Sequence, residues 1–139
     1  MPVKELARTD PIAATRQASI AQVSALMRDE NVGSVVIVED DEPVGILTDR
    51  DVTVKVTAEG KDPTDVTAED VMTPDPVVVD GDVGLMELTH TMADNGVRRV
   101  PVVDGGKLDG IITLDDVDKL LSDERQNLAT VIETESPPY

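Results

Sequence analysis

The sequence predicts an α+β fold built from two consecutive copies of one βαββα unit. The main observation is an internal repeat at an offset of 65 residues. The second is the pattern inside each copy, where apolar residues at helical spacing give way to short β-branched runs. The third is composition: 40% of the 139 residues are hydrophobic, yet the chain has no Phe, no Trp and a single Tyr. The core must therefore be aliphatic.

The repeat aligns residues 10–52 with residues 75–117 without a gap. Self-similarity of this kind indicates a duplicated structural unit. Twelve of the 43 aligned positions are identical, and in the first copy they are Asp10, Pro11, Met27, Asp29, Val32, Val35, Val38, Gly45, Ile46, Thr48, Asp51 and Val52. We therefore place a first domain with its linker at residues 1–66 and a second domain with its tail at residues 67–139.

Each copy begins with a strand and a helix. The strand follows the Asp-Pro pair, at 12–14 and 77–79. The apolar residues of the helix share one face, and they are Ile20, Val23 and Met27 in copy one and Leu85, Leu88 and Met92 in copy two. Ser19 and Gln22 form a candidate capping box. Asn and Gly residues at 31–33 and 95–96 suit the two helix ends.

A hairpin follows each helix. Its first strand is a short β-branched run, at 35–38 and 100–103, of the kind that is buried in a sheet. Acidic or Gly-rich turns at 39–42 and 104–107 lead into a second strand, which ends at Leu47 or Ile112.

The last element of the unit is ambiguous in copy one. Residues 52–57 are mostly Val and Thr, which favour strands over helices. The aligned segment 114–122 has a helical pattern, so the repeat predicts a helix in both copies. Segment 58–67 is the linker. Residues 123–133 continue in helical period, and the Ser-Pro-Pro end at 136–138 is expected to be disordered.

The formal charge of −17, from 29 acidic and 12 basic residues, restricts the partners of this chain. Such a charge repels phosphate backbones and anionic membranes, so we expect neither nucleic-acid nor membrane binding. It also suggests a salt-rich cytoplasm, as in a halophilic archaeon, since salt screens self-repulsion; an ordinary acidic protein is the alternative. There is no Cys and no long apolar run, so we expect a cytoplasmic protein without disulfides.

Thr48 and Asp51 lie where a strand ends and a helix begins, and Thr113 and Asp116 repeat this arrangement. Free N–H groups at a helix start attract phosphate, and a carboxylate can accept both hydrogens of a ribose diol. Thr-x-x-Asp is also nearly a capping box, which needs no ligand. Both interpretations stay open at this point.

No catalytic or metal-binding set emerges from the residues. The single His90 lies in the middle of a predicted helix, and the acidic run 39–42 lacks the spacing of a calcium loop. No Ser-His-Asp set, Cys-His set or phosphate-binding Gly-Lys motif is present. We expect a protein that is not an enzyme and has no metal or catalytic cofactor.

The sequence resembles the tandem form of the CBS domain family, named after cystathionine β-synthase. The resemblance covers residues 3 to 121 and rests on Val71–Val77, Arg99–Asp104 and the two Gly-x-x-Thr-x-x-Asp segments. Copy one departs from the pattern at Val36, where the family has Pro, and in its lead-in at 6–9. The resemblance implies two sheets packed face to face with pseudo-twofold symmetry. It also implies two clefts for AMP, ADP, ATP, S-adenosylmethionine or NAD-type ligands, and a homodimer.

The resemblance implies that each cleft combines residues of both copies. The first cleft would contain Thr48, Asp49, Arg50, Asp51, Thr73, Val77, Val78, Val97, Arg98 and Arg99. The second cleft would contain Arg8, Ile12, Ala13, Val32, Gly33, Ser34, Thr113, Asp115 and Asp116.

The two predicted clefts differ in charge. Arg50, Arg98 and Arg99 fall in the first cleft, whereas Asp115 and Gly33-Ser34 take their places in the second. Arginines bind phosphate oxygens through charge-assisted hydrogen bonds. The first cleft is therefore predicted to bind AMP, ADP or ATP more tightly. The alternative is that these arginines only pair with surface carboxylates.

Three function classes follow. The first is a regulatory module that senses an adenine nucleotide and signals to an effector protein. The second is a dimeric scaffold that needs no ligand and uses the apolar stripe on 114–132. The third is a small hydrolase, which has no nameable base and nucleophile.

Overall fold

The computed structural model describes residues 1–135, and the Ser-Pro-Pro end lies outside them. In chain order its elements are η1 (Val3–Glu5), β1 (Ala13–Thr15), α1 (Ile20–Glu30), β2 (Ser34–Glu39), β3 (Glu42–Thr48), α2 (Asp49–Val52), η2 (Thr53–Thr57), α3 (Ala68–Val71), β4 (Thr73–Pro74), β5 (Val79–Asp80), α4 (Leu85–Asn95), β6 (Arg99–Asp104), β7 (Lys107–Thr113) and α5 (Leu114–Glu135).

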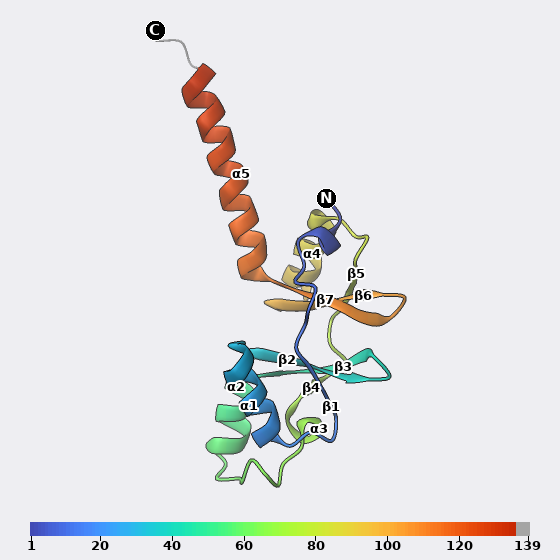
Figure 1. Ribbon diagram of the computed structural model, residues 1–139. Helices are drawn as coiled ribbons and strands as arrows, with labels where there is room; N and C mark the ends of the chain where they lie inside the picture. The colour runs from blue at the N-terminus through green and yellow to red at the C-terminus, as the bar shows by residue number, and fades with distance from the viewer. Residues whose placement is uncertain (136–139) are drawn as a thin grey trace.

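The strands form two sheets, in the orders β1-β2-β3-β4 and β5-β6-β7. The β1–β2 and β5–β6 pairs are parallel, and the hairpins β2–β3 and β6–β7 are antiparallel. The two sheets face one another, and the helices α1 to α4 lie on their outer sides (Figure 1). This is the predicted mixed α+β architecture of two stacked repeats.

Local sequence signals set most of these boundaries. The Ser19–Gln22 capping box opens α1, and Asn31 ends it with φ of 54°. Gly96 ends α4 with φ of 62°. The hairpin turns use Asp40-Asp41 in the first sheet and Gly105-Gly106 in the second, all at positive φ. Such turns match the twist of the flanking strands.

Two predicted elements differ from the structure in detail. The helix after Thr48 is present, but its β-branched half, Thr53–Thr57, winds as a π-helix. The predicted strand 77–79 shrinks to Val79–Asp80, because only these residues pair with β6. Val77 instead lines a pocket between the sheets.

Each sheet has its own buried aliphatic core, and each core takes a segment from the other half of the sequence. Ala68, Val71 and Met72 pack into the first core with Ile20 and Leu47. Val3 packs into the second core, where Leu6 and Ala7 also contribute. The exchange is symmetric in the repeat, because Thr73 pairs with Ile46 while Arg8 bridges to Ile111.

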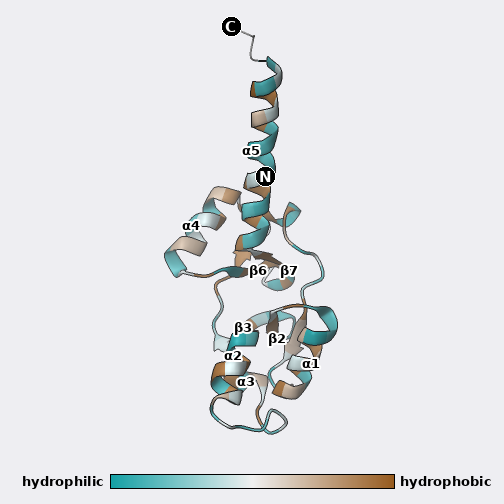
Figure 2. Ribbon diagram, turned by 90° about the vertical axis from the view of Figure 1, so that its left-hand side faces the viewer, coloured by the Kyte–Doolittle hydropathy of each residue, from teal (hydrophilic) through white to brown (hydrophobic). Residues whose placement is uncertain are grey.

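Helix α5 is the longest element, with 22 residues. Only its base packs on the second core, through Val117. The rest projects away from the body of the molecule (Figure 1). Hydrophobic residues recur along its projecting part (Figure 2). No described helix has the length and apolarity that a membrane span requires.

Candidate functional site

Two pockets lie between the sheets, and they correspond to the two predicted clefts. Pocket 1 has a volume of about 240 Å³ and is lined by Ile46, Thr48, Thr73, Asp75, Pro76, Val77, Val97, Arg98 and Arg99. Pocket 2 has a volume of about 380 Å³ and is lined by Arg8, Asp10, Pro11, Ile12, Glu30, Asn31, Val32, Gly33, Ser34, Arg99, Ile111, Thr113 and Asp115.

The repeat relates the two pockets residue by residue. Each of the nine residues that line pocket 1 has its counterpart, 65 positions away, in the lining of pocket 2. Pocket 2 adds Glu30, Asn31, Arg99 and Asp115 to these nine. The two pockets are therefore variants of one site whose side chains have diverged.

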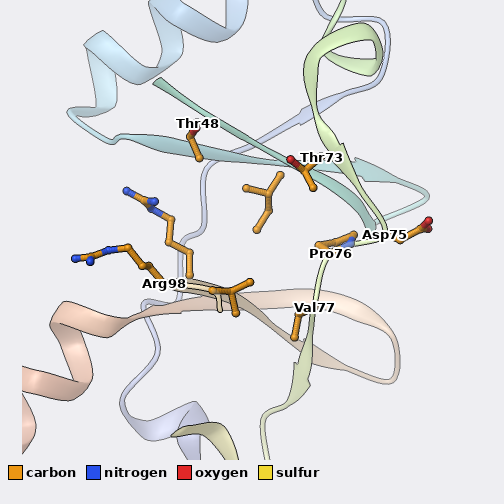
Figure 3. Close-up of a pocket in the computed structure, with 9 residues that line it drawn as sticks. Thr48, Thr73, Asp75, Pro76, Val77 and Arg98 are labelled. Carbon is orange, nitrogen blue, oxygen red and sulfur yellow. The ribbon is translucent and has the colours of Figure 1, made fainter. Parts of the chain in front are cut away.

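Pocket 1 combines apolar walls with a basic end. Thr48 and Thr73 extend from the first sheet, while Val77 and Arg98 belong to the second half of the chain (Figure 3). Ile46, Pro76, Val77 and Val97 supply the apolar walls. The lining includes two arginines, Arg98 and Arg99, and a single carboxylate, that of Asp75.

Pocket 2 has the opposite balance of charge. Its lining contains two arginines, Arg8 and Arg99, and three carboxylates, those of Asp10, Glu30 and Asp115. Asp115 also lies 3.9 Å from the guanidinium of Arg98. The lining of pocket 1 therefore has more arginines than carboxylates, whereas the lining of pocket 2 has more carboxylates than arginines.

Four residues predicted for the first cleft do not line pocket 1. Val78 is exposed and lines a shallower hollow beside Pro43 and Val103. Arg50 is exposed on α2, so the predicted cluster of three arginines contains only Arg98 and Arg99. Asp49 turns its Oδ1 toward the N–H of Arg50, at 2.8 Å. The fourth residue is Asp51.

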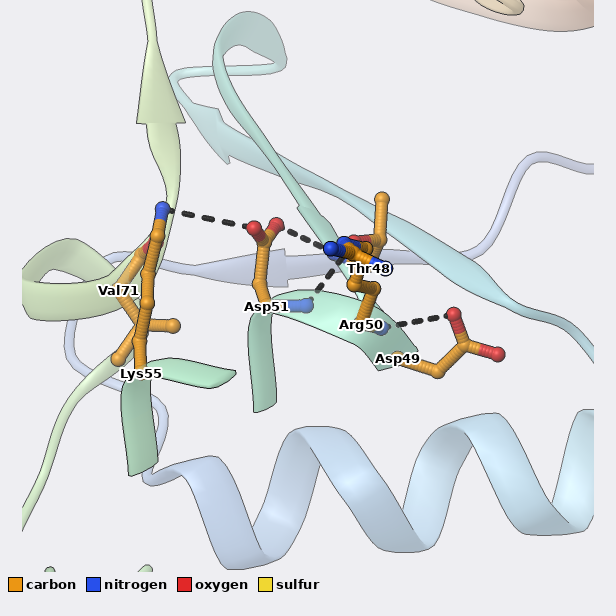
Figure 4. A network of polar contacts seen from close by, with 6 residues as sticks. All are labelled: Thr48, Asp49, Arg50, Asp51, Lys55 and Val71. Carbon is orange, nitrogen blue, oxygen red and sulfur yellow. Dashed lines mark hydrogen bonds and ion pairs between the residues drawn. The ribbon is translucent and has the colours of Figure 1, made fainter. Parts of the chain in front are cut away.

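Asp51 is engaged in a capping box with Thr48 (Figure 4). Its Oδ2 accepts a hydrogen bond from the Thr48 N–H at 2.9 Å, and its own N–H donates to Thr48 Oγ1 at 3.2 Å. Its Oδ1 lies 3.4 Å from Lys55 Nζ, which also donates to the Val71 carbonyl. The capping interpretation of Thr-x-x-Asp is thus realised in the structure, and only Oδ1 remains for a ligand.

The first N–H groups of α2 are already hydrogen-bonded. Asp49 N–H donates to the Gly33 carbonyl at 3.0 Å, and those of Arg50 and Asp51 donate to side-chain oxygens. Two aspartates also occupy the first turn. The expected free donors for phosphate are therefore absent from the start of α2, and the arginines are the cationic groups available to an anion in pocket 1.

The second cleft repeats this arrangement with a different cation. Thr113 and Asp116 form the same pair of hydrogen bonds, at 3.0 and 3.2 Å. Asp116 Oδ1 accepts from Arg8 Nη2 at 3.3 Å. Seven of the residues predicted for the second cleft line pocket 2: Arg8, Ile12, Val32, Gly33, Ser34, Thr113 and Asp115. The other two, Asp116 and the exposed Ala13, do not.

Sequence reasoning missed Glu30 and Asn31 in pocket 2, which no pattern singles out. It also missed three residues of pocket 2, Asp10, Pro11 and Ile111, and their counterparts in pocket 1. These three pairs are identical between the two copies, so the repeat itself contained a signal for them. Among residues 1–135 no group of three or more His, Asp or Glu gathers in a way that could hold a metal ion.

A model of the CBS domain matches residues 3–57 and again residues 68–123. An uncharacterized protein of Methanopyrus kandleri is 43% identical over 117 residues, which are 83% of this chain and 60% of that protein. A CBS domain-containing protein of Bacillus subtilis is 33% identical over 115 residues, covering 83% of this chain and 81% of its own length.

Solved structures agree with these relatives. Hypoxic Response Protein I with two coordinated zinc ions matches at a TM-score of 0.77 and 28% identity, covering 86% of this chain and 98% of its own. A CBS domain pair in complex with 5′-methylthioadenosine and S-adenosyl-L-methionine also has a TM-score of 0.77 and 28% identity, covering 87% and 99%. Both matches therefore share the overall fold of this chain. The chain belongs to the CBS domain family, as a tandem pair of the kind that serves as a regulatory module.

Proposed function

We propose that this chain senses an adenine nucleotide, AMP, ADP or ATP, which binds in pocket 1. The observation that carries the proposal is the lining of that pocket, where four aliphatic walls meet two guanidinium groups. Aliphatic side chains can sandwich a planar base without any aromatic residue. Guanidinium groups bind phosphate oxygens with two parallel hydrogen bonds.

The size of pocket 1 agrees with a partly enclosed ligand. Its volume of about 240 Å³ lies just below the range of about 300–1,000 Å³ found for small-molecule pockets. The base and ribose occupy the apolar part, and the phosphates extend toward Arg98 and Arg99. Thr48 binds one ribose hydroxyl from the pocket lining. Asp51 lies outside the lining, and its Oδ1 reaches a second hydroxyl once Asp51 gives up its ion pair to Lys55.

Pocket 2 favours a less anionic adenosyl ligand. Its three carboxylates against two arginines disfavour a polyphosphate and suit the positive sulfonium of S-adenosylmethionine. The complex of a related CBS pair with S-adenosyl-L-methionine and 5′-methylthioadenosine supports an adenosyl ligand for this pocket class.

Calorimetric titration of AMP, ATP and S-adenosylmethionine into the full chain tests this proposal. Replacing Arg98 with Ser should weaken AMP about tenfold or more, since a charge-assisted hydrogen bond contributes about 1.5–3 kcal/mol. Arg50→Ser is the matched control, because it removes the same charge outside both pockets. Equal losses in the two variants would mean that only net charge matters, and no binding of any of the three compounds would overturn the proposal.

Asp51→Ala and Asp116→Ala complete this titration by separating the two pockets. Asp51→Ala is expected to weaken AMP, while Asp116→Ala leaves its tighter site intact. Loss of AMP binding in Asp116→Ala alone would reverse the assignment of the two pockets.

The output of the sensor is proposed to pass through α5 to a second copy of the chain and an effector protein. Four large apolar side chains on this helix are each more than half exposed, namely Leu121, Leu128, Val131 and Ile132. A groove of about 260 Å³ at its base is lined by Met92, Ala93, Val97, Leu114 and Val117, with Arg98 at its edge. Glu133 and Glu135, at the far end of α5, complement that arginine in charge.

These features fit an antiparallel homodimer, in which the tip of each α5 packs against the base of the other. Such an interface is self-complementary, as twofold symmetry requires. Sedimentation equilibrium of Leu128→Gln/Ile132→Gln, which keeps the net charge, should show a monomer where the parent chain is a dimer. A monomeric parent chain would refute the dimer, and a dimer in both would place the interface elsewhere. If the dimer forms and no nucleotide binds, the function is that of a ligand-independent scaffold.

A further inference from the structure

Arg99 is the one residue that the linings of pocket 1 and pocket 2 share among residues 1–135. The other lining residues of pocket 1 correspond to separate residues of pocket 2. In pocket 1, Arg99 takes the position that Ser34 takes in pocket 2. Arg99 also lines pocket 2, together with Ser34 itself.

The position of Arg99 explains this double role. It begins β6, as Ser34 begins β2. Its Nη2 is 3.7 Å from the place where a Cβ on Gly33 would stand, so the guanidinium reaches across to the first copy. A larger residue at position 33 would crowd this path.

No ion pair within residues 1–135 holds this guanidinium. Arg8 pairs with Asp116, Arg16 with Glu39 and Arg98 with Asp115, whereas Arg99 has no carboxylate within 4.0 Å. A carboxylate near it is that of Asp49, whose Oδ2 lies 3.3 Å from the same Cβ position on Gly33 without forming an ion pair. Its side chain is half-buried between the sheets. In a chain with a net charge of −17, such an arginine is available to an incoming anion.

Moving Arg99 toward one pocket changes the charge of the other. Without it, pocket 2 keeps only Arg8, which already pairs with Asp116, against three carboxylates. Pocket 1 without it keeps only Arg98 beside Asp75. An anion in one pocket therefore removes a favourable charge from the other.

We propose that Arg99 couples the two pockets, so that an anionic ligand in one pocket weakens the binding of a second anion in the other. This coupling rests on the proposed nucleotide binding and specifies its regulation. Because binding coupling is reciprocal, either anion weakens the other by the same factor. A cationic adenosyl ligand in pocket 2 does not bind more weakly when pocket 1 is filled. Its affinity rises, because a nucleotide in pocket 1 draws Arg99 away and leaves pocket 2 more negative.

AMP titrated calorimetrically into the full chain tests the coupling. Thr73→Trp obstructs pocket 1 alone and Val32→Trp obstructs pocket 2 alone, so each variant reports the intrinsic affinity of the open pocket. In the parent chain we expect the second AMP to bind at least about fivefold more weakly than its intrinsic affinity, the lower end of typical coupling. Ile12→Trp replaces Val32→Trp if circular dichroism shows that the latter misfolds.

Arg99→Ser places in copy two the residue that copy one has at the equivalent position. We expect both pockets to lose affinity and to bind AMP independently. Arg98→Ser is the matched control, since Arg98 lines pocket 1 only: it should weaken that pocket and leave the coupling factor unchanged. The Nε–H signal of Arg99 in NMR spectra, assigned by its loss in Arg99→Ser, should shift when either pocket is filled.

The outcomes separate the coupling from the proposed function. Two independent sites in the parent chain overturn the coupling and leave nucleotide binding standing. Coupling that persists in Arg99→Ser overturns the role of this residue. No AMP binding in the parent chain or in either obstructed variant overturns both.

Discussion

Replacing Gly110 with Ala should destabilise the fold, because the lead-in segment at residues 7–8 of the first copy packs directly against Gly110 in the second copy. A Cβ on Gly110 would stand 2.7 Å from the Arg8 carbonyl oxygen and 3.3 Å from Ala7 Cβ. Ordinary contact begins near 3.4 Å, so the Arg8 backbone must retreat by about 0.7 Å. Arg8 and Ile111 exchange two backbone hydrogen bonds, of 2.9 and 3.1 Å, which this retreat breaks or stretches.

Each of these hydrogen bonds contributes about 0.5–1.5 kcal/mol. The lower entropy of the unfolded alanine chain returns about 0.4–1 kcal/mol. The expected net loss in the free energy of unfolding is therefore about 1.3 kcal/mol, within a range of about 0–2.6 kcal/mol. Gly45→Ala is the matched control, because Gly45 is the counterpart of Gly110 in the repeat. Its Cβ meets the buried Met72 side chain, with Sδ nearest, Cγ at 2.9 Å and Cβ at 3.1 Å, so Met72 must change rotamer to make room. A flexible methionine yields more readily than a backbone.

Urea unfolding followed by far-ultraviolet circular dichroism measures both variants, since the chain has no Trp and only one Tyr. Gly110→Ala should lose more stability than Gly45→Ala. It should also weaken ligand binding in pocket 2, which Arg8 lines. The reasoning is refuted if Gly110→Ala unfolds at the urea concentration of the parent chain, or if Gly45→Ala is the less stable of the two.

Four further predictions concern local features. The melting temperature should rise between about 0.1 and 2 M KCl, since salt screens the charge of −17, and a constant value would contradict the idea of a salt-adapted protein. Asp41→Gly, at φ of 64° in a hairpin turn, should stabilise the fold by about 0.5–1 kcal/mol in urea unfolding, unless the exposed turn tolerates Asp without strain. Ser19→Ala removes the cap of α1 and should cost about 1 kcal/mol, with Ser24→Ala in the middle of the same helix as the neutral comparison. Hydrogen bonds from the Thr67 N–H and then from its hydroxyl lower the pKa of Asp70, so their contribution to stability is present above the unfolded pKa of Asp and is lost as the pH falls through the folded pKa. Thr67→Val removes the hydroxyl and keeps the N–H, so it should raise the pKa of Asp70 part of the way in an NMR titration, and an unchanged pKa would exclude a contribution of the hydroxyl.

Local chemistry made much of the fold predictable. The cap residues Ser19 and Asn31, the paired turn residues and the β-branched runs each act within a few residues of the chain. The repeat supplied what local propensity could not, because it identified residues 52–57 as helical. It could not foresee the π-helix, in which the Ala58 N–H reaches back to the Thr53 carbonyl at 2.9 Å. Crowding among successive β-branched side chains lowers the stability of a regular α-helix here.

The strand β4 and the lead-in near Arg8 were not predictable from pattern. β4 has two residues, which is too short for any periodicity, and its partner β3 lies about 27 residues earlier in the chain. The same limit applies to the site. The repeat located the two Thr-x-x-Asp segments, but only the structure shows that Asp51 and Asp116 turn toward the backbone while Arg99 reaches both pockets.

The exchange of lead-in segments between the two cores governs how the chain can be assembled on the ribosome. The first core is incomplete until Met72 has been synthesised. Val3 cannot be fully buried until Val117, which belongs to the same core, has been synthesised. A fragment that stops at residue 66 would lack the α3 side chains that close the first core, and the remainder would lack η1. Contacts of such long sequence separation slow folding. They also mean that neither half can open alone without exposing part of the other, so the two copies are expected to unfold as one cooperative unit.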